Sequence, residues 1–139
     1  MRTVFADTSY WIAASDCKDS WATSAASAEA ALGATVLVTT DEVLIEYLAA
    51  FSGAGRKVRE RSALYVRRLF SRSDVSVVQQ SRRSFLDGLG LYQARPDKGY
   101  SLTDCIAMCT MRAQGIREVL TTDRHFAQEG FTILLQRPN

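Results

Sequence analysis

Histidine is nearly absent from the sequence, because His125 is the only one among 139 residues. A ribonuclease mechanism built on two histidines is therefore excluded. Cysteine is also rare, with only Cys17, Cys105 and Cys109, an odd count in a chain that shows no export signal. We expect reduced thiols, and we interpret the last two cysteines as small buried apolar residues instead of zinc ligands.

Long apolar runs are missing as well, and none approaches the ~20 residues that a membrane span requires. Near the N-terminus only residues 10–14 form an uninterrupted apolar stretch, which is too short for a signal-peptide core. We therefore expect a cytoplasmic protein. The apolar content of 47% and charged content of 23% are typical of soluble globular proteins, and the length predicts a single domain over residues 1–139.

Lysine is scarce, whereas arginine is frequent and crowds residues 56–72, with Arg82 and Arg83 soon after. The net charge of +2 is too small to indicate a nucleic-acid partner by itself. The planar guanidinium group suits phosphate oxygens. A solvated helix face explains the basic segment equally simply, and taken alone the segment favours that explanation.

Strand and helix patterns alternate along the whole chain. Strands are predicted at residues 3–6, 35–38, 75–78, 118–121 and 132–135. Helices are predicted at residues 8–14, 18–32, 39 or 40 to 51, 56–72, 81–92, 102–113 and 124–128. This order favours an α/β fold of three layers (α/β/α), with a central, mainly parallel sheet of four or five strands. In such sheets the functional crevice lies at the carboxyl ends of the strands.

Acidic residues recur at that predicted edge. Asp7 follows the first strand directly, and Asp123 follows the fourth. Glu42 and Glu46 lie one helical turn apart after the second strand, and Asp104 lies near the start of a late helix. Carboxylates that converge in one place repel each other and must either take up protons or share a cation. Oxygen ligands of this kind suit Mg²⁺ or Mn²⁺, which can bind a phosphate and lower the pKa of a bound water.

Helix capping is the other explanation for these acids. Asp7 and Asp123 could cap the helical turns that follow them. Glu42 stands three residues after Thr39, and Asp104 three after Ser101, and both spacings match a capping box. Glu46 is too deep in its predicted helix to cap it, and a carboxylate among apolar neighbours is costly without a partner.

Four short strings resemble the motifs of PIN domains in order and spacing. They are Phe-Ala-Asp-Thr-Ser at the start, Glu-Tyr-Leu around Glu46, Leu-Thr-Asp-Cys-Ile-Ala and Leu-Thr-Thr-Asp-Arg-His-Phe. The resemblance spans almost the whole chain, and the short length is similar to that of VapC toxins of bacterial type II toxin–antitoxin systems. It implies an Mg²⁺- or Mn²⁺-dependent endoribonuclease in which metal-activated water attacks the phosphodiester in line, leaving 5′-phosphate and 3′-hydroxyl ends.

The same resemblance implies the site residues and partners. The metal-binding and catalytic acids would be Asp7, Glu46, Asp104 and Asp123. We favour Glu46 over Glu42 because Glu42 has a capping role available. Secondary candidates are Thr8, Ser9, Glu42 and Thr122, and candidates for RNA-backbone contacts are Arg95, Lys98 and Arg124. An antitoxin protein and a homodimer are the partners that the resemblance implies.

Four alternatives are considered at this point. A phosphoryl-accepting receiver or a phosphatase-like domain also places an acid after its first strand. The former would need a lysine after a late strand, and the latter a second Asp where Ser9 stands, so both fit poorly. A binding module without catalysis, and an RNA-processing PIN nuclease without an antitoxin, stay open.

Overall fold

The computed structural model describes residues 1–137, which contain one sheet of five parallel strands. The strands lie in the order β3-β2-β1-β4-β5, so the first strand of the chain is the central one. Their bounds are β1 Arg2–Ala6, β2 Thr35–Thr40, β3 Val75–Val78, β4 Glu118–Leu120 and β5 Thr132–Ile133. The predicted parallel α/β fold is confirmed.

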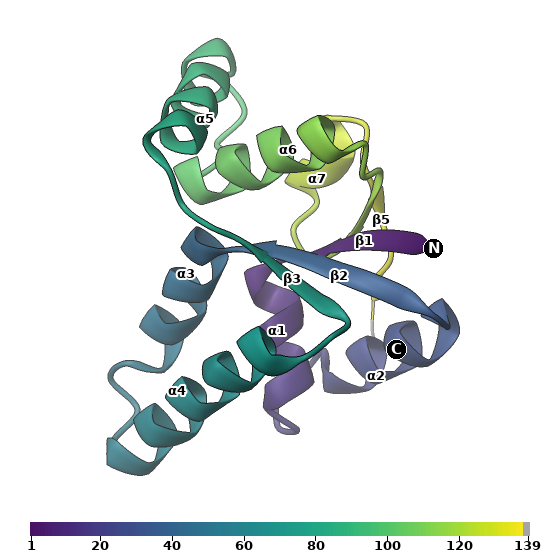
Figure 1. Cartoon of the computed structure of the whole chain (residues 1–139), viewed down its shortest axis with the longest axis vertical. Helices are drawn as coiled ribbons and strands as arrows, with labels where there is room; N and C mark the ends of the chain where they lie inside the picture. The colour runs from purple at the N-terminus through teal and green to yellow at the C-terminus, as the bar shows by residue number, and fades with distance from the viewer. Residues whose placement is uncertain (138–139) are drawn as a thin grey trace.

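Helices cover both faces of the sheet (Figure 1). On one side lie α1 to α4, which connect β1 to β2 and β2 to β3, and on the other side lie α5 to α7. The helix bounds are α1 Thr8–Ser15, α2 Ala22–Leu32, α3 Asp41–Phe51, α4 Arg56–Ser71, α5 Arg82–Ala94, α6 Leu102–Gln114 and α7 His125–Gln128. Within residues 1–137, none of these helices combines the length and the apolar composition that a membrane crossing requires.

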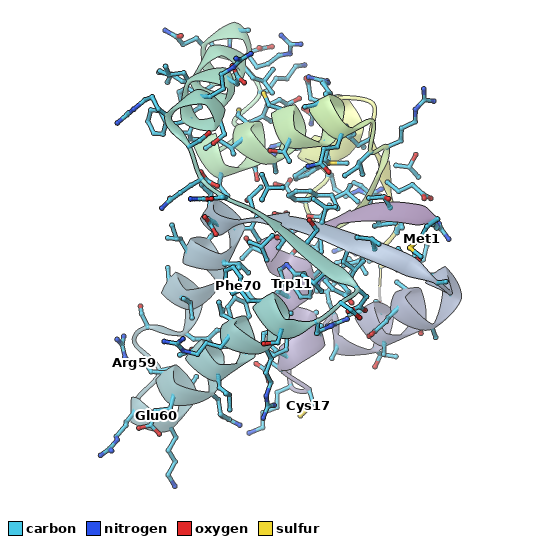
Figure 2. All side chains as sticks on the ribbon, in the orientation of Figure 1. Met1, Trp11, Cys17, Arg59, Glu60 and Phe70 are labelled. Carbon is cyan, nitrogen blue, oxygen red and sulfur yellow. The ribbon has the colours of Figure 1, made fainter. Side chains whose placement is uncertain are left out.

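The core is built around β1, because a central parallel strand is covered on both faces and must be apolar on both. Val4, Phe5 and Ala6 are completely buried. Below the sheet, the buried indole of Trp11 donates a hydrogen bond to Thr39 Oγ1 (3.2 Å), which in turn donates to the Ala6 carbonyl (2.9 Å) (Figure 2). One hydroxyl thus joins α1, β2 and β1 just before the carboxyl end of β1.

The strand order places β1 and β4 side by side at the point where the chain changes its direction of travel across the sheet. From β1 the chain moves outward to β2 and β3, then returns to the opposite side of β1 as β4. Such a switch point opens a crevice at the carboxyl ends of the two strands. The Asp7 amide, just beyond β1, donates to the Leu120 carbonyl at the end of β4 (3.0 Å).

Some element boundaries differ from those that the sequence predicts. The helix expected from residue 18 begins at Ala22, because the Asp19 carboxylate accepts a hydrogen bond from the Trp21 amide and closes a turn there (2.9 Å). The last strand is Thr132–Ile133 instead of residues 132–135, and its only partner, β4, is itself a strand of three residues.

Candidate metal centre

Asp7 is the most deeply buried of the predicted site acids, with 4% of its surface exposed. It precedes α1, yet its side chain makes no capping hydrogen bond, so the capping explanation is wrong for this residue. Oδ2 accepts a hydrogen bond from Thr121 Oγ1 (2.8 Å), whereas Oδ1 is buried without a partner in the described part of the chain. Burial raises the pKa of Asp7 to about 7, and the charges of Asp104 and Glu46 act in the same direction.

Asp104 lies in the first turn of α6 and carries the predicted capping box. Its Oδ2 accepts from the Ser101 amide (3.0 Å), and its own amide donates to Ser101 Oγ (3.0 Å). Only 8% of Asp104 is exposed, and burial raises the pKa of this carboxyl, with the charges of Asp123 and Glu46 adding to the shift. Asp104 therefore caps α6 and also lies close enough to the other acids to be affected by their charge.

Asp123 joins Asp7 through one threonine hydroxyl. Thr121 Oγ1, which donates to Asp7, accepts a hydrogen bond from the Asp123 amide (3.0 Å). Ser9 completes this arrangement from α1, because its Oγ lies 3.3 Å from Thr121 Oγ1 and accepts from the Thr122 amide (2.9 Å). The segment after β4 is thereby fastened to the start of α1.

Glu46 and Glu42 both lie on α3 but differ in what they contact. Glu46 is exposed, so the expectation of an apolar environment for it is wrong; its negative charge nevertheless raises the pKa of both Asp7 and Asp104. The capping role expected of Glu42 is also wrong, because α3 begins at Asp41 and its cap is Thr40, whose Oγ1 accepts from the Val43 amide (3.1 Å). Of the two glutamates, Glu46 is therefore the one whose charge affects the pKa of the other acids.

We call Asp7, Glu46, Asp104 and Asp123 the acidic cluster. Each aspartate has one oxygen fixed by the chain: Oδ2 of Asp7, Oδ2 of Asp104, and Oδ1 of Asp123, which accepts from the His125 amide (2.9 Å). The second oxygen of each accepts no side-chain or backbone hydrogen bond from the described residues. Oriented, repelling carboxylates with a buried oxygen lacking a partner fit a hard divalent cation such as Mg²⁺ or Mn²⁺.

The secondary candidates divide between structural and site roles. Thr8 is buried, and its hydroxyl donates to the Val43 carbonyl of α3 (3.5 Å). Ser9 contacts Thr121 and the Thr122 amide instead of an acid, so its role at the site stays a prediction. Thr122 contributes only its backbone amide, and it is the preceding Thr121 whose side chain reaches Asp7.

The predicted RNA-contacting residues are not equivalent. Arg95 lies with its guanidinium against Glu129, donating from Nε (3.0 Å) and Nη2 (3.4 Å), so its prediction as a phosphate ligand conflicts with this pairing. Lys98 lies 3.9 Å from Asp97 in a loose surface pair. Arg124 is exposed beside Asp123 and forms no ion pair within residues 1–137, which leaves it the best placed of the three.

Glu129 is a hub of hydrogen bonds, because its carboxylate accepts from the side chains of Arg95, Tyr100 and Arg112. Its side chain is 5% exposed and lies 2.8 Å from Tyr100 Oη and 2.9 Å from Arg112 Nη2. Burial alone would raise the pKa of Glu129, but hydrogen bonds from Arg112, Arg95 and Tyr100 outweigh it and lower the pKa to about 2. Tyr100 directly precedes Ser101, the cap of α6, so this hub holds the loop that orients Asp104.

Sequence reasoning missed two residues at this edge. Thr121 is fully buried and polar, and the only available signal was its place at the end of an apolar strand. His125 lies two residues after Asp123, and one of its ligand atoms falls with those of Asp104 and Asp123 in a group whose members are within 4.8 Å of one another. Its signal was the singular histidine in the string Asp-Arg-His-Phe.

Comparison with known proteins gives the chain a family and structural relatives. The sequence profile of the PIN domain matches residues 4–131. VapC20 from Mycobacterium tuberculosis, described as a sarcin-ricin loop cleaving toxin, has a similar structure, with a TM-score of 0.83 at 22% identity over 96% of this chain and 99% of that one. PAE2754 from Pyrobaculum aerophilum gives a TM-score of 0.59 at 14% identity, covering 96% and 90%. At such identities these structures show the shared fold alone, and no curated protein sequence matches the chain.

Proposed function

The chain belongs to the PIN domain family, and we propose that it is a divalent-metal-dependent endoribonuclease, the toxin of a toxin–antitoxin pair. The observation that carries this proposal is the state of Asp7. A buried carboxylate with no hydrogen-bond partner for one of its oxygens is energetically costly. Its neighbours are further carboxylates, so a cation is the species that would relieve the cost.

The residues that would hold this ion are Asp7, Asp104 and Asp123, each offering the oxygen that the chain leaves without a hydrogen bond. When bound, Mg²⁺ or Mn²⁺ supplies charge neutralisation at the scissile phosphate and a lower pKa for water. Thr121 and Ser101 keep two of the carboxylates oriented, which spares reorganisation during the reaction. Glu46 is exposed, and its charge raises the pKa of Asp7 and Asp104, so we assign it the orientation of the attacking water.

RNA is the substrate that we propose. The exposed Arg124 lies beside Asp123, so a phosphate at the acidic cluster would fall within its reach, and Lys98 lies on the loop before α6. Backbone contacts of this kind position a nucleic acid without reading its sequence. Since VapC20 is described as cleaving the sarcin–ricin loop, an RNA of that sequence is the first defined substrate to test.

We propose that the antitoxin binds this chain through an amphipathic helix with an acidic face. A groove of about 430 Å³ lies between the end of α1, α3 and α4, and its lining includes none of the four acids of the acidic cluster. Its apolar lining includes Phe51, Leu64 and Tyr65, and its basic lining includes Lys18, Arg61 and Arg68. An apolar floor with basic edges complements a helix that has one apolar and one acidic face.

A second copy of the chain is the other partner that we propose. Phe85, Leu89 and Tyr92 follow one another at helical spacing along α5, and Phe85 and Tyr92 are 39% and 50% exposed. Neighbouring exposed apolar side chains of this kind mark a protein–protein contact. We assign this stripe to a homodimer.

Cleavage of a mixed cellular RNA pool tests the proposed activity. Wild-type protein with Mn²⁺ is expected to cleave, whereas EDTA or the Asp7→Asn variant is expected to reduce cleavage at least a hundredfold. Thr23→Ala, an exchange on the distant helix α2, serves as the matched control and should cleave like wild type. A folded wild-type protein that neither cleaves RNA nor binds Mn²⁺ would instead support a binding module.

A further inference from the structure

His125 has the geometry of a ligand atom next to the acidic cluster. Its Nδ1 lies 3.1 Å from Asp123 Oδ1 but forms no hydrogen bond with any of the described residues. The hydrogen bond to Asp123 Oδ1 comes instead from the His125 backbone amide (2.9 Å). The side-chain nitrogen Nδ1 is therefore buried next to the Asp123 carboxylate but is not hydrogen-bonded to it.

The spacing of these atoms suits one metal ion. In octahedral coordination with bonds of about 2.1 Å, adjacent ligand atoms are separated by roughly 3 Å and opposite ones by roughly 4.2 Å. Nδ1 lies 3.1 Å from the Asp123 carboxylate, and ligand atoms of Asp104, Asp123 and His125 all lie within 4.8 Å of one another, a spread that one ion can bridge after small side-chain rotations. Asp7, nearly fully buried with Oδ1 lacking a partner, is tied to Asp123 through Thr121 and points independently to a cation here.

The surroundings fix the imidazole in place. The ring of Tyr100 packs edge-on against that of His125, with centroids 5.3 Å apart, and Tyr100 is itself held by Glu129. An oriented second shell of this kind strengthens metal sites. With Nδ1 bound to a metal, the ring proton would be on Nε2, which lies on the Gly99 side of the ring.

We propose that His125 is a metal ligand, so that the centre is a mixed site of carboxylate oxygens and one imidazole nitrogen that prefers Mn²⁺ to Mg²⁺. This inference rests on the proposed metal dependence and adds a ligand and a metal preference to it. Mg²⁺ prefers oxygen ligands and gives up its waters reluctantly, whereas imidazole nitrogen suits first-row transition metals.

Electron spin echo spectroscopy of the Mn²⁺-loaded chain tests the proposal without using activity. Because His125 is the only histidine in the sequence, an imidazole ¹⁴N coupling to the manganese identifies it without ambiguity. We expect this coupling in the wild type, its replacement by a ¹⁵N pattern after labelling with ¹⁵N-histidine, and its loss in His125→Asn. By titration calorimetry, His125→Asn should weaken Mn²⁺ binding at least about tenfold and change Mg²⁺ binding less.

Gln128→Ala, an exposed position on the same short helix, is the matched control and should keep both the coupling and the affinity. Bound Mn²⁺ without any imidazole coupling in the wild type overturns the role of His125 and leaves the proposed nuclease intact. Absence of Mn²⁺ binding by the folded wild-type chain overturns both. The wild-type spectrum decides the question even where a variant fails to fold.

Discussion

Among single residues, Asp7 couples the protonation of one carboxylate to the stability of the fold. Burial raises its pKa to about 7 in the folded chain, from an ordinary value of 3.8. Between these values the folded state binds more protons than the unfolded state, so its contribution to stability is complete below about pH 4 and is lost as the pH rises through 7. A cation at the site would replace the lost protons.

The corresponding prediction concerns the melting temperature of the metal-free chain. Between pH 5 and pH 8 in EDTA, the wild type should lose roughly 5 °C or more relative to Asp7→Asn, which cannot ionise. Added Mn²⁺ at pH 8 should raise the melting temperature of the wild type and leave that of the variant unchanged. If the melting temperatures of the two proteins changed equally with pH in EDTA, ionisation of Asp7 would not destabilise the fold, and the prediction would be wrong.

How far the sequence predicts this site also depends on single residues. Asp7 and Asp123 are predictable because each lies within three residues of the end of an apolar strand, and the carboxyl ends of parallel strands share an edge. Thr121 is not, because a strand-end threonine is ordinary and only the pairing of β1 with β4 brings its hydroxyl to Asp7. His125 is not, because a metal-binding role requires a ring orientation that no sequence pattern encodes.

Among the helices and strands, the contact between α5 and α6 determines how Asp104 is presented. Gly88 lies on α5 where a Cβ would collide with Ile106 of α6, at 3.1 Å from its backbone nitrogen and also against Cγ1 of its side chain. Backbone cannot yield as a flexible side chain can. The two helices can approach this closely only because residue 88 is glycine.

Two glycine substitutions on one helix therefore have opposite expected effects. Gly88→Ala should lower the free energy of unfolding by about 1–3 kcal/mol through overpacking. Gly90→Ala adds a Cβ with nothing within 4 Å and should raise it by about 0.5–1 kcal/mol, because alanine favours the helix. Urea denaturation of both variants measures the difference; equal stabilities would mean that α5 and α6 can slide apart at no cost.

The Glu129 hub supports a second prediction at this scale. Glu129→Gln leaves Arg95 and Arg112 without their charged partner and should cost about 1–3 kcal/mol of unfolding free energy. Glu118→Gln removes a similar carboxylate from its surface pair with Arg2, and should cost less than about 1 kcal/mol. Because the hub orients the loop before α6, only Glu129→Gln should also weaken Mn²⁺ binding. Thermal melts and metal titration of the pair distinguish the two positions.

Element boundaries show where pattern reasoning ends. Both ends of the strand at 75–78 are predicted correctly, because a short valine-rich run between polar residues favours a strand with these bounds. The cap of α3 is less predictable, because Thr39 and Thr40 are equal in sequence. Thr40 takes the cap since the hydroxyl of Thr39 is already bonded to Ala6 and Trp11 in the core.

For the whole molecule, the apolar stripe on α5 predicts a dimer. Sedimentation or light scattering should show twice the monomer mass for the wild type and a monomer for Tyr92→Glu, because a charge in the contact is costly. Ala94→Glu, about 200° around the helix from Tyr92, is the matched control and should stay dimeric. A wild type that remains monomeric at micromolar concentration overturns the assignment of the stripe.

The central place of β1 has a consequence for synthesis of the chain. Asp7 directly follows the first strand, but its partner Thr121 and the neighbouring strand β4 come more than a hundred positions later in the chain. Contacts so distant along the chain form late in folding. A polypeptide that stops before β4 lacks both Thr121 and Asp123, so its acidic cluster is incomplete. The proposed metal centre can therefore assemble only after synthesis has passed β4.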